Sequence, residues 1–310
     1  MNNEIELVIQ KHFNELPKEV VRMTTGICNE VYLVKLKDKS VIVRMNELDR
    51  FLKGSSKNIP TFKSKGIKVP DILFEDYSKQ TIPFGYQIMS VIEGEDLGAV
   101  IHTLTPEQMK TIAQEISNIL IKLSDLPTNG KFGWIDDSDS KLVDSWSDVM
   151  LRMYHDMVDR NDKTNVVGKE LIDFASNLIS KHKNYFDKVP SKYVYDDLSG
   201  KNVMIKNGKF SGLVDLDQIM YGDLLEPVGR IKASWYGTKY GKIYTDAVME
   251  YLGLSKEQQE MVTVYALLNR ISWLSEIGIQ FNQNTSTNID PKRVSDGKNV
   301  IGLIRQELAS

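Results

Sequence analysis

The chain has 310 residues, of which 41% are hydrophobic and 26% are charged, a globular composition that excludes collagenous, low-complexity and disordered proteins. Its formal net charge of −3 and its dispersed lysines argue against a nucleic-acid partner, because nucleic-acid binders usually carry a basic patch. The single cysteine, Cys28, excludes an intramolecular disulfide, and no apolar run approaches the roughly 18 residues that span a bilayer, so we expect a cytoplasmic protein with no membrane partner.

The first 90 residues are predicted to consist mostly of strands. Residues 1–13 are an exception, because they begin polar and acidic, lack the basic start of a signal peptide and predict an amphipathic helix. Residues 29–46 hold two runs of Val, Ile, Tyr and Leu joined by the polar turn 37–40, which predicts a β-hairpin. A further strand is expected at 84–92, before the turn-like residues 93–96.

The segment 51–73 between these strands is ambiguous. It is consistent with a helix, yet it contains four residues that weaken one: Gly54, Ser55, Ser56 and Pro60. Between residues 53 and 65 the segment is rich in Ser and Lys and contains no acidic residue.

After residue 97 the pattern becomes helical. Thr105 is a good helix cap, Pro106 suits the first helical position and Gln108 completes a capping box, so a helix is predicted over 105–127. Further helices are expected at about 143–160, 168–186, 242–252, 256–276 and 292–308.

One hairpin interrupts the helical half. Residues 202–217 have strand character on both sides of Asn207-Gly208, a pair that favours a type I′ turn. The predicted fold class is therefore α+β and bilobal. A small, antiparallel, β-rich lobe covers residues 1–91, and a larger, mainly helical lobe covers residues 92–310. A connector near 89–97 joins the lobes, and the junction of two lobes is a common place for a ligand.

The hairpin is also where carboxylates concentrate. Asp197 and Asn202 precede its first strand and Asp215 ends its second, so the turn brings these residues towards one point. A carboxylate and an amide oxygen are hard ligands that suit Mg²⁺ bound together with phosphate oxygens. A further carboxylate nearby can receive a proton from an attacking hydroxyl.

These residues resemble the catalytic core of the aminoglycoside phosphotransferase and choline kinase superfamily, which shares the protein-kinase fold. "DLSGKN" at 197–202 is followed by "GLVDLD" at 212–217, and Asp215 stands thirteen positions beyond Asn202, where that fold places its metal-binding aspartate. Other segments resemble the family in the same order over residues 20–275: "TTGICNEVYLV", "VIVRMN", "YQIMSVIEGEDL", "LSDLP", "FGW" and "MYGDLLEP". The core pair of motifs is specific, whereas the glycine loop alone is a weak signal.

The resemblance implies a phosphoryl transferase that uses ATP or GTP and Mg²⁺. Asp197 would orient or deprotonate the acceptor hydroxyl, and Asn202 and Asp215 would hold the metal. The remaining residues that it implies are a further metal ligand, Asp217; a cation for the α- and β-phosphates, Arg44; a loop glycine over the phosphates, Gly26; and hinge residues at the nucleotide, Met89, Ser90 and Val91.

The chain departs from the family pattern at three places. Tyr195 stands where the family has a histidine that holds the catalytic loop, and Asp196 creates an adjacent pair in which the spacing to Asn202 selects Asp197. Arg44 stands where many relatives have lysine, and its planar fork makes different contacts. The glutamate that normally pairs with this cation has no clear counterpart, because Glu47 is too close to Arg44 in sequence.

Ordinary structural roles are the alternatives. Asp and Asn favour turns and caps, so Asp197, Asn202 and Asp215 are also consistent with such residues. Asp217 and Asp223 are also consistent with structural acids, and Gly26 with an ordinary turn. Residues 134–148 are acid-rich, which suits either helix caps or a pocket for a cationic substrate. Four aromatic residues suit either helix packing or stacking on a sugar: Trp235, Tyr236, Tyr240 and Trp273.

The predicted function is transfer of the γ-phosphate of a nucleoside triphosphate to a hydroxyl of a small molecule. The first expectation for the acceptor is an aminoglycoside-like antibiotic, and the alternative is a choline, ethanolamine or sugar kinase. A nucleotide-binding regulatory protein without catalysis is the hypothesis from another class, motivated by Tyr195 and by the missing glutamate.

Overall fold

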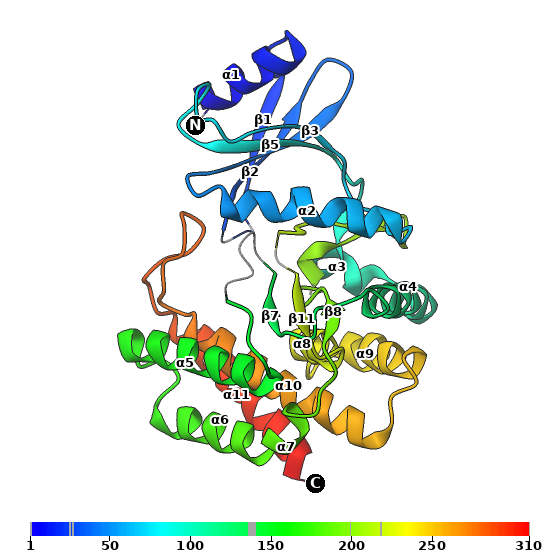
Figure 1. Cartoon of the computed structure of the whole chain (residues 1–310), viewed down its shortest axis with the longest axis vertical. Coiled ribbons are helices and arrows are strands. Elements are labelled where there is room, and N and C mark those ends of the chain that lie inside the picture. The colour runs from blue at the N-terminus through cyan, green and yellow to red at the C-terminus, as the bar shows by residue number, and fades with distance from the viewer. Residues whose placement is uncertain are drawn as a thin grey trace.

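The computed structural model describes residues 2–309, apart from 25, 27, 136–140, 199 and 218. Two lobes are stacked along the long axis of the molecule (Figure 1). The smaller lobe is built on an antiparallel sheet with the strand order β1-β2-β3-β5-β4. Its strands are β1 (Glu19–Met23), β2 (Glu30–Lys35), β3 (Ser40–Asn46), β4 (Ile72–Asp76) and β5 (Gly85–Ser90). The hairpin at 29–46 and the strand at 84–92 are thereby confirmed.

Helix α1 (Asn2–Phe13) confirms the amphipathic helix predicted at the start of the chain. Three residues from its apolar face enter a small core that is separate from the core of the other lobe: Ile5, Val8 and Ile9. The sheet contributes Val34, Val43 and Ile88, which are fully buried. Burial of this stripe against the sheet, at roughly 1.5–3 kcal/mol for each large apolar side chain, holds α1 in place.

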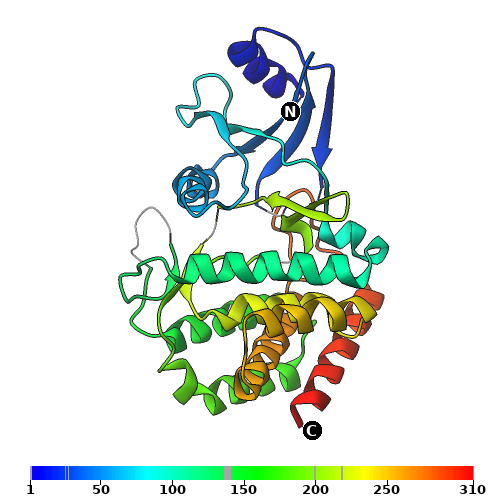
Figure 2. The same cartoon turned by 90° about the vertical axis from the view of Figure 1, so that its right-hand side faces the viewer.

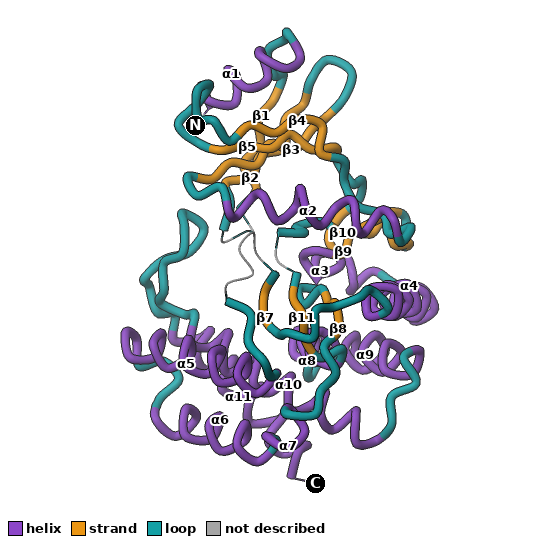
Figure 3. Tube along the Cα trace, viewed as in Figure 1, coloured by secondary structure: helices purple, strands orange, loops and turns teal. Residues whose placement is uncertain are grey.

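The ambiguous segment forms helix α2 (Arg50–Ser64), which crosses the region between the lobes (Figures 1 and 3). Gly54 and Pro60 both lie inside this helix, where each lowers its intrinsic stability. Tertiary packing overrides that preference, because Leu52, Ile59 and Phe62 are buried. Gly54 also has a specific purpose, since a Cβ at this position would overlap the backbone of Asp217.

The larger lobe is mainly helical (Figure 3). Its helices are α3 (Leu97–Val100), the 3₁₀ turn η1 (Ile101–Thr103), α4 (Pro106–Ser124), α5 (Trp146–Thr164), α6 (Lys169–Lys181), α7 (Lys183–Phe186), α8 (Leu225–Trp235), α9 (Lys239–Tyr251), α10 (Lys256–Ser275) and α11 (Pro291–Ala309). Helix α10 packs against α8, α11 and α5, and α4 lies beside α9, as Figure 2 shows from the side.

Most of the predicted helices are confirmed with small differences at their ends. The capping box of Thr105 and Gln108 is present at the start of α4. The helix predicted over 168–186 is interrupted at His182 and forms α6 and α7. Helix α8 was not predicted, although it carries residues of the candidate site.

Two small sheets support the candidate site. The first has the order β10-β9-β6 and contains β6 (Glu95–Asp96), β9 (Val203–Lys206) and β10 (Lys209–Leu213). The second has the order β7-β11-β8 and contains β7 (Gly133–Trp134), β8 (Lys192–Val194) and β11 (Met220–Gly222). Asn207 and Gly208 have φ of 52° and 72°, the positive values that a type I′ turn requires, so the predicted hairpin is confirmed.

The architecture is α+β and bilobal, as predicted, with a small antiparallel lobe and a larger helical one (Figure 1). The exact division between residues 1–91 and 92–310 stays a prediction. Within the part of the chain that the structure describes, none of the helices combines the length and apolar character needed to cross a membrane.

Candidate active site

A buried tyrosine anchors the loop that follows β8. Tyr195 is fully buried and packs edge-on against Phe62 of α2, with ring centroids 5.9 Å apart. Its hydroxyl lies 2.9 Å from the carbonyl oxygen of Val214 and 3.0 Å from that of Asp215, so its proton is shared between two acceptors. Burial raises the pKa of this hydroxyl well above its ordinary value, which keeps it a donor. Tyr195 thus joins the loop of Asp197 to the segment of Asp215.

Asp197 lies between two cations. Its carboxylate oxygens are 3.2 Å from Lys201 Nζ and 3.5 Å from an Nη of Arg230 on α8. Burial disfavours the charged form of Lys201, but Asp197 and Asp215 attract it and raise the pKa of the ammonium overall. Lys201 and Arg230 were not singled out from the sequence. Lys201 stands inside the "DLSGKN" motif, whereas Arg230 belongs to the unpredicted α8.

Asn202 closes the 3₁₀ turn η2 (Gly200–Asn202), immediately before β9. Its side-chain Nδ2 donates to the carbonyl oxygen of Asp197 at 3.0 Å. Its own carbonyl oxygen accepts from the backbone N–H of Val214 at 3.1 Å. The hairpin therefore brings Asp197, Asn202 and the start of the Asp215 segment together.

Asp215 adopts a backbone conformation that is uncommon for a residue with a side chain. Its φ is 62°, in the left-handed region, where a non-glycine residue is strained unless its surroundings hold it. The Tyr195 hydroxyl at its carbonyl supplies one such restraint. The carboxylate is 44% exposed and lies 3.4 Å from Arg44.

Asn202 and Asp215 form a donor set that fits a magnesium ion bound with nucleotide phosphates. Magnesium usually takes one or two protein carboxylates or amides and completes its octahedron with phosphate oxygens and water. The amide nitrogen of Asn202 is held by the Asp197 carbonyl, which turns the amide oxygen away from that contact, and the Asp215 carboxylate is accessible. The metal roles of both residues stay predictions.

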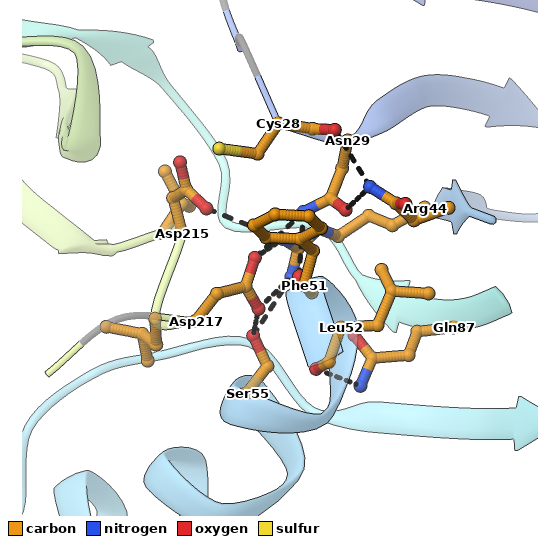
Figure 4. Close-up of polar contacts among 12 residues, drawn as sticks. Cys28, Asn29, Arg44, Phe51, Leu52, Ser55, Gln87, Asp215 and Asp217 are labelled. Atoms are coloured by element: carbon orange, nitrogen blue, oxygen red, sulfur yellow. Dashed lines mark hydrogen bonds and ion pairs between the residues drawn. The ribbon is translucent and has the colours of Figure 1, made fainter. Parts of the chain in front are cut away.

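Arg44 of β3 is almost completely buried at the junction of the lobes (Figure 4). Its Nη1 donates to Ser55 Oγ at 2.9 Å and to Asp217 Oδ1 at 3.0 Å, and its Nη2 donates to Asp217 Oδ2. Burial lowers the pKa of the guanidinium, but a free arginine titrates so high that the side chain stays charged. A buried charge needs a partner, and the partner here is Asp217.

Asp217 therefore lies at Arg44, with its side chain only 9% exposed. Asn29 Nδ2 donates to Asp217 Oδ2 at 2.9 Å. The expectation that Asp217 is a further metal ligand stays a prediction.

The residues expected at the nucleotide lie on the smaller lobe and its exit. The carbonyl oxygen of Gly26, in the connection between β1 and β2, accepts from Asn282 Nδ2 at 3.2 Å and also from Asn284. Among the hinge residues, Met89 is buried and its sulfur lies 3.9 Å from Arg44 Nη1, while Ser90 Oγ accepts from the backbone of Asp71. Val91 follows β5, where the chain passes towards the other lobe.

A network of buried charges lies behind Asp197. Asp196 is buried 3.8 Å from Arg230, and burial raises the pKa of its carboxyl although Arg230 opposes this effect. Glu226 is fully enclosed beside Asn269 and Arg230, and burial raises the pKa of Glu226 to about 7. Asp196 is thus part of a structural cluster, while Asp197 is the more accessible of the adjacent pair.

Other candidates have structural surroundings. Asp223 is buried, and its carboxylate accepts from the hydroxyls of Tyr185 and Tyr265, both at 2.7 Å, and from the backbone of Leu225. Within the acid-rich segment, residues 136–140 lie outside the described residues, and Ser145 caps α5.

The four aromatic candidates lie against the helices. Three of them are partly buried and pack against the core of the larger lobe: Trp235, Tyr236 and Tyr240. Trp273 lies beneath the guanidinium groups of Arg230 and Arg270, at 5.8 and 5.6 Å from its ring.

Comparison with known proteins assigns the chain to a family. A family model described as the phosphotransferase enzyme family, APH, matches residues 19–260. The chain belongs to the APH phosphotransferase family. A search of curated protein sequences found no match.

Solved structures of APH enzymes share the fold of this APH-family chain. A thermostable variant of aminoglycoside phosphotransferase APH(4)-Ia, in a ternary complex with AMP-PNP and hygromycin B, has a TM-score of 0.72 at 13% identity and covers 98% of both chains. The GDP and kanamycin complex of APH(2″)-IIIa has a TM-score of 0.70 at 14% identity, covering 96% of this chain and 97% of the other. ADP-bound APH(2″)-Ib has a TM-score of 0.66 at 14% identity and covers 97% of both chains. At these identities the likeness shows the fold alone.

Proposed function

We propose that the protein is a small-molecule kinase that transfers the γ-phosphate of ATP or GTP to a hydroxyl of an aminoglycoside-like acceptor. The observation that carries the proposal is the convergence of Asp197, Asn202 and Asp215, held together by the Tyr195 hydroxyl and the β9-β10 hairpin. The Asp215 carboxylate is accessible and lies 3.4 Å from the buried Arg44, so a cation of the smaller lobe faces this group of residues.

The side chains suit an in-line phosphoryl transfer. The oxygen of the acceptor hydroxyl forms a bond to the γ-phosphorus, and Asp197 accepts the proton of that hydroxyl. The bond from the γ-phosphorus to the bridging oxygen breaks, and the nucleoside diphosphate leaves. Arg44 would contact the α- and β-phosphates, and Asn202 and Asp215 would hold Mg²⁺. The metal, when bound, neutralises charge on the transferred phosphoryl group.

Lys201 and Arg230 add two roles within this scheme. Both contact Asp197 and so hold its carboxylate in one orientation. The Lys201 ammonium, which attracts both Asp197 and Asp215, would offset negative charge that develops on the transferred group.

The acceptor class is supported by the likeness to enzymes whose complexes contain hygromycin B or kanamycin. Fold alone does not determine which acceptor an enzyme phosphorylates. Choline, ethanolamine and simple sugars form the competing acceptor set.

The test is release of nucleoside diphosphate from ATP or GTP, measured with Mg²⁺ over a panel of aminoglycosides, amino alcohols and sugars. We expect phosphorylation of at least one aminoglycoside, identified by the mass of one added phosphoryl group. We also expect Asp197→Asn to reduce kcat by about 10²–10⁴-fold while nucleotide binding persists.

Asp173→Asn is the matched control, because it makes the same replacement in an exposed pair with Lys169. Phosphoryl transfer to an amino alcohol or a sugar, with none to an aminoglycoside, would show that the proposed acceptor class is wrong. Nucleotide binding without any transfer would favour the regulatory alternative, and normal turnover in Asp197→Asn would refute the assignment of the base.

A further inference from the structure

The buried cation of the smaller lobe takes its counter-ion from the other lobe. Arg44 lies on β3, and Asp217 lies just beyond β10 in the larger lobe. Helix α2 passes beside Arg44 but offers it only the hydroxyl of Ser55, because α2 contains no acidic residue. We propose that Asp217 is the positioning residue for Arg44 and supplies the acid that α2 lacks, an inference that rests on the proposed function of this site.

The four acceptor positions of the Asp217 carboxylate are already used. Oδ1 accepts from Arg44 Nη1 and from Ser55 Oγ, while Oδ2 accepts from Arg44 Nη2 and from Asn29 Nδ2 (Figure 4). An ionised carboxylate has about four lone-pair sites, so this set leaves none for a metal ion. The side chain is 9% exposed, against 44% for Asp215. These contacts separate the two aspartates into a counter-ion and an accessible ligand.

The contacts of Arg44 indicate which of its N–H groups serves a nucleotide. Asp217 engages the guanidinium at both terminal nitrogens, the geometry that fixes its plane. The contact from Nη2 to Asp215 is longer, at 3.4 Å, and its acceptor is exposed. With Asp215 as a ligand of a bound cation, this N–H would be free to donate to phosphate, while Asp217 would still hold the guanidinium.

Helix α2 has the residues that this arrangement requires. Gly54 allows the helix to approach the backbone of Asp217, where any Cβ would overlap it. Asn58 Nδ2 donates to the carbonyl oxygen of Leu216 at 2.8 Å. Small and polar residues therefore dock α2 directly on the segment that carries Asp217.

A stability measurement without metal and nucleotide separates the two roles of Asp217. In EDTA, Asp217→Asn should lower the melting temperature by several degrees, because it leaves Arg44 buried without its charged partner. A residue that served only as a metal ligand would give the opposite result, since removing one of two neighbouring carboxylates relieves repulsion. An unchanged or higher melting temperature would therefore overturn the proposal.

Relocation of the carboxylate is the second test. Asp217→Ser should raise the KM for nucleotide and lower kcat/KM by about a hundredfold, with the KM for acceptor little changed. The exchange Ser55→Asp with Asp217→Ser returns a carboxylate to Arg44 from α2, where Ser55 Oγ already lies 2.9 Å from Nη1. We expect the kcat/KM of this double variant to be at least tenfold higher than that of Asp217→Ser.

The control combines Asp217→Ser with Lys57→Asp, which places the new acid at an exposed position of the same helix. Its kcat/KM should be no higher than that of Asp217→Ser alone. A folded exchange variant with no more activity than Asp217→Ser would overturn the positioning role. If the wild-type protein transferred no phosphate at all, the proposed function would fail, and the melting comparison in EDTA would still decide whether Asp217 is the counter-ion.

Discussion

Tyr195→Phe tests how the candidate site is held together. The change removes one hydroxyl from a fully buried ring and leaves the contact with Phe62 in place. Two carbonyl oxygens, of Val214 and Asp215, lose their shared donor at 2.9 and 3.0 Å. A buried acceptor without its donor costs about 1–3 kcal/mol; these two hydrogen bonds are only part-buried and share one proton, so the expected loss is near the lower end, about 1–2 kcal/mol.

The loss has a structural and a catalytic readout. A melting temperature lower by about 2–6 °C is expected for that change in the free energy of unfolding. Because the same hydroxyl restrains Asp215 at its strained φ, kcat should fall about tenfold or more, with the larger effect at low Mg²⁺ concentration. Urea denaturation and steady-state kinetics over a magnesium series measure both quantities.

Tyr193→Phe is the matched control two residues earlier. Its hydroxyl lies 3.3 Å from Asn58 Oδ1 and has no contact with the Asp215 segment among the hydrogen bonds of the described residues. It should lose little activity. Equal losses of kcat in the two variants, or full activity in Tyr195→Phe, would refute the idea that Tyr195 positions Asp215.

Two further predictions concern packing and pH. Gly54→Ala should destabilise the protein by about 1–3 kcal/mol in urea denaturation despite the better helix propensity of alanine, because its Cβ would overlap the Asp217 backbone. A Cβ at Gly302 on α11 would meet open space, so Gly302→Ala should be neutral or stabilising. Equal changes in unfolding free energy in the two variants would contradict the close approach of α2 to the Asp217 backbone. Burial raises the pKa of Glu226 from 4.5 to about 7, so the folded protein keeps this proton in a range where the unfolded chain has lost it, and stability falls as pH rises through that range. Between pH 4.5 and 7, the free energy of unfolding of Glu226→Gln should rise relative to that of the wild type by roughly 3 kcal/mol at most. A difference between the two proteins that does not change with pH would contradict the raised pKa of Glu226.

Local sequence determined the elements and the order of the motifs. The capping box of Thr105 and Gln108 and the Asn207-Gly208 turn depend on contacts within a few residues, so their patterns predicted them correctly. The spacing to Asn202 selects Asp197 over Asp196, and that choice stays a prediction; Asp196 lies among buried charges, with its side chain 9% exposed against 25% for Asp197.

Only the tertiary structure decided how charges pair between distant segments. Arg44 and Asp217 are 173 positions apart, and their pairing depends on how α2 docks against the β10 end. The same docking makes a helix of residues 50–64 in spite of Gly54 and Pro60. Helix propensities and motif spacing describe neighbours along the chain, whereas burial of a charge obliges it to find a partner wherever the fold brings one. That is why the sequence showed an arginine without its glutamate, and the folded chain shows an aspartate in its place.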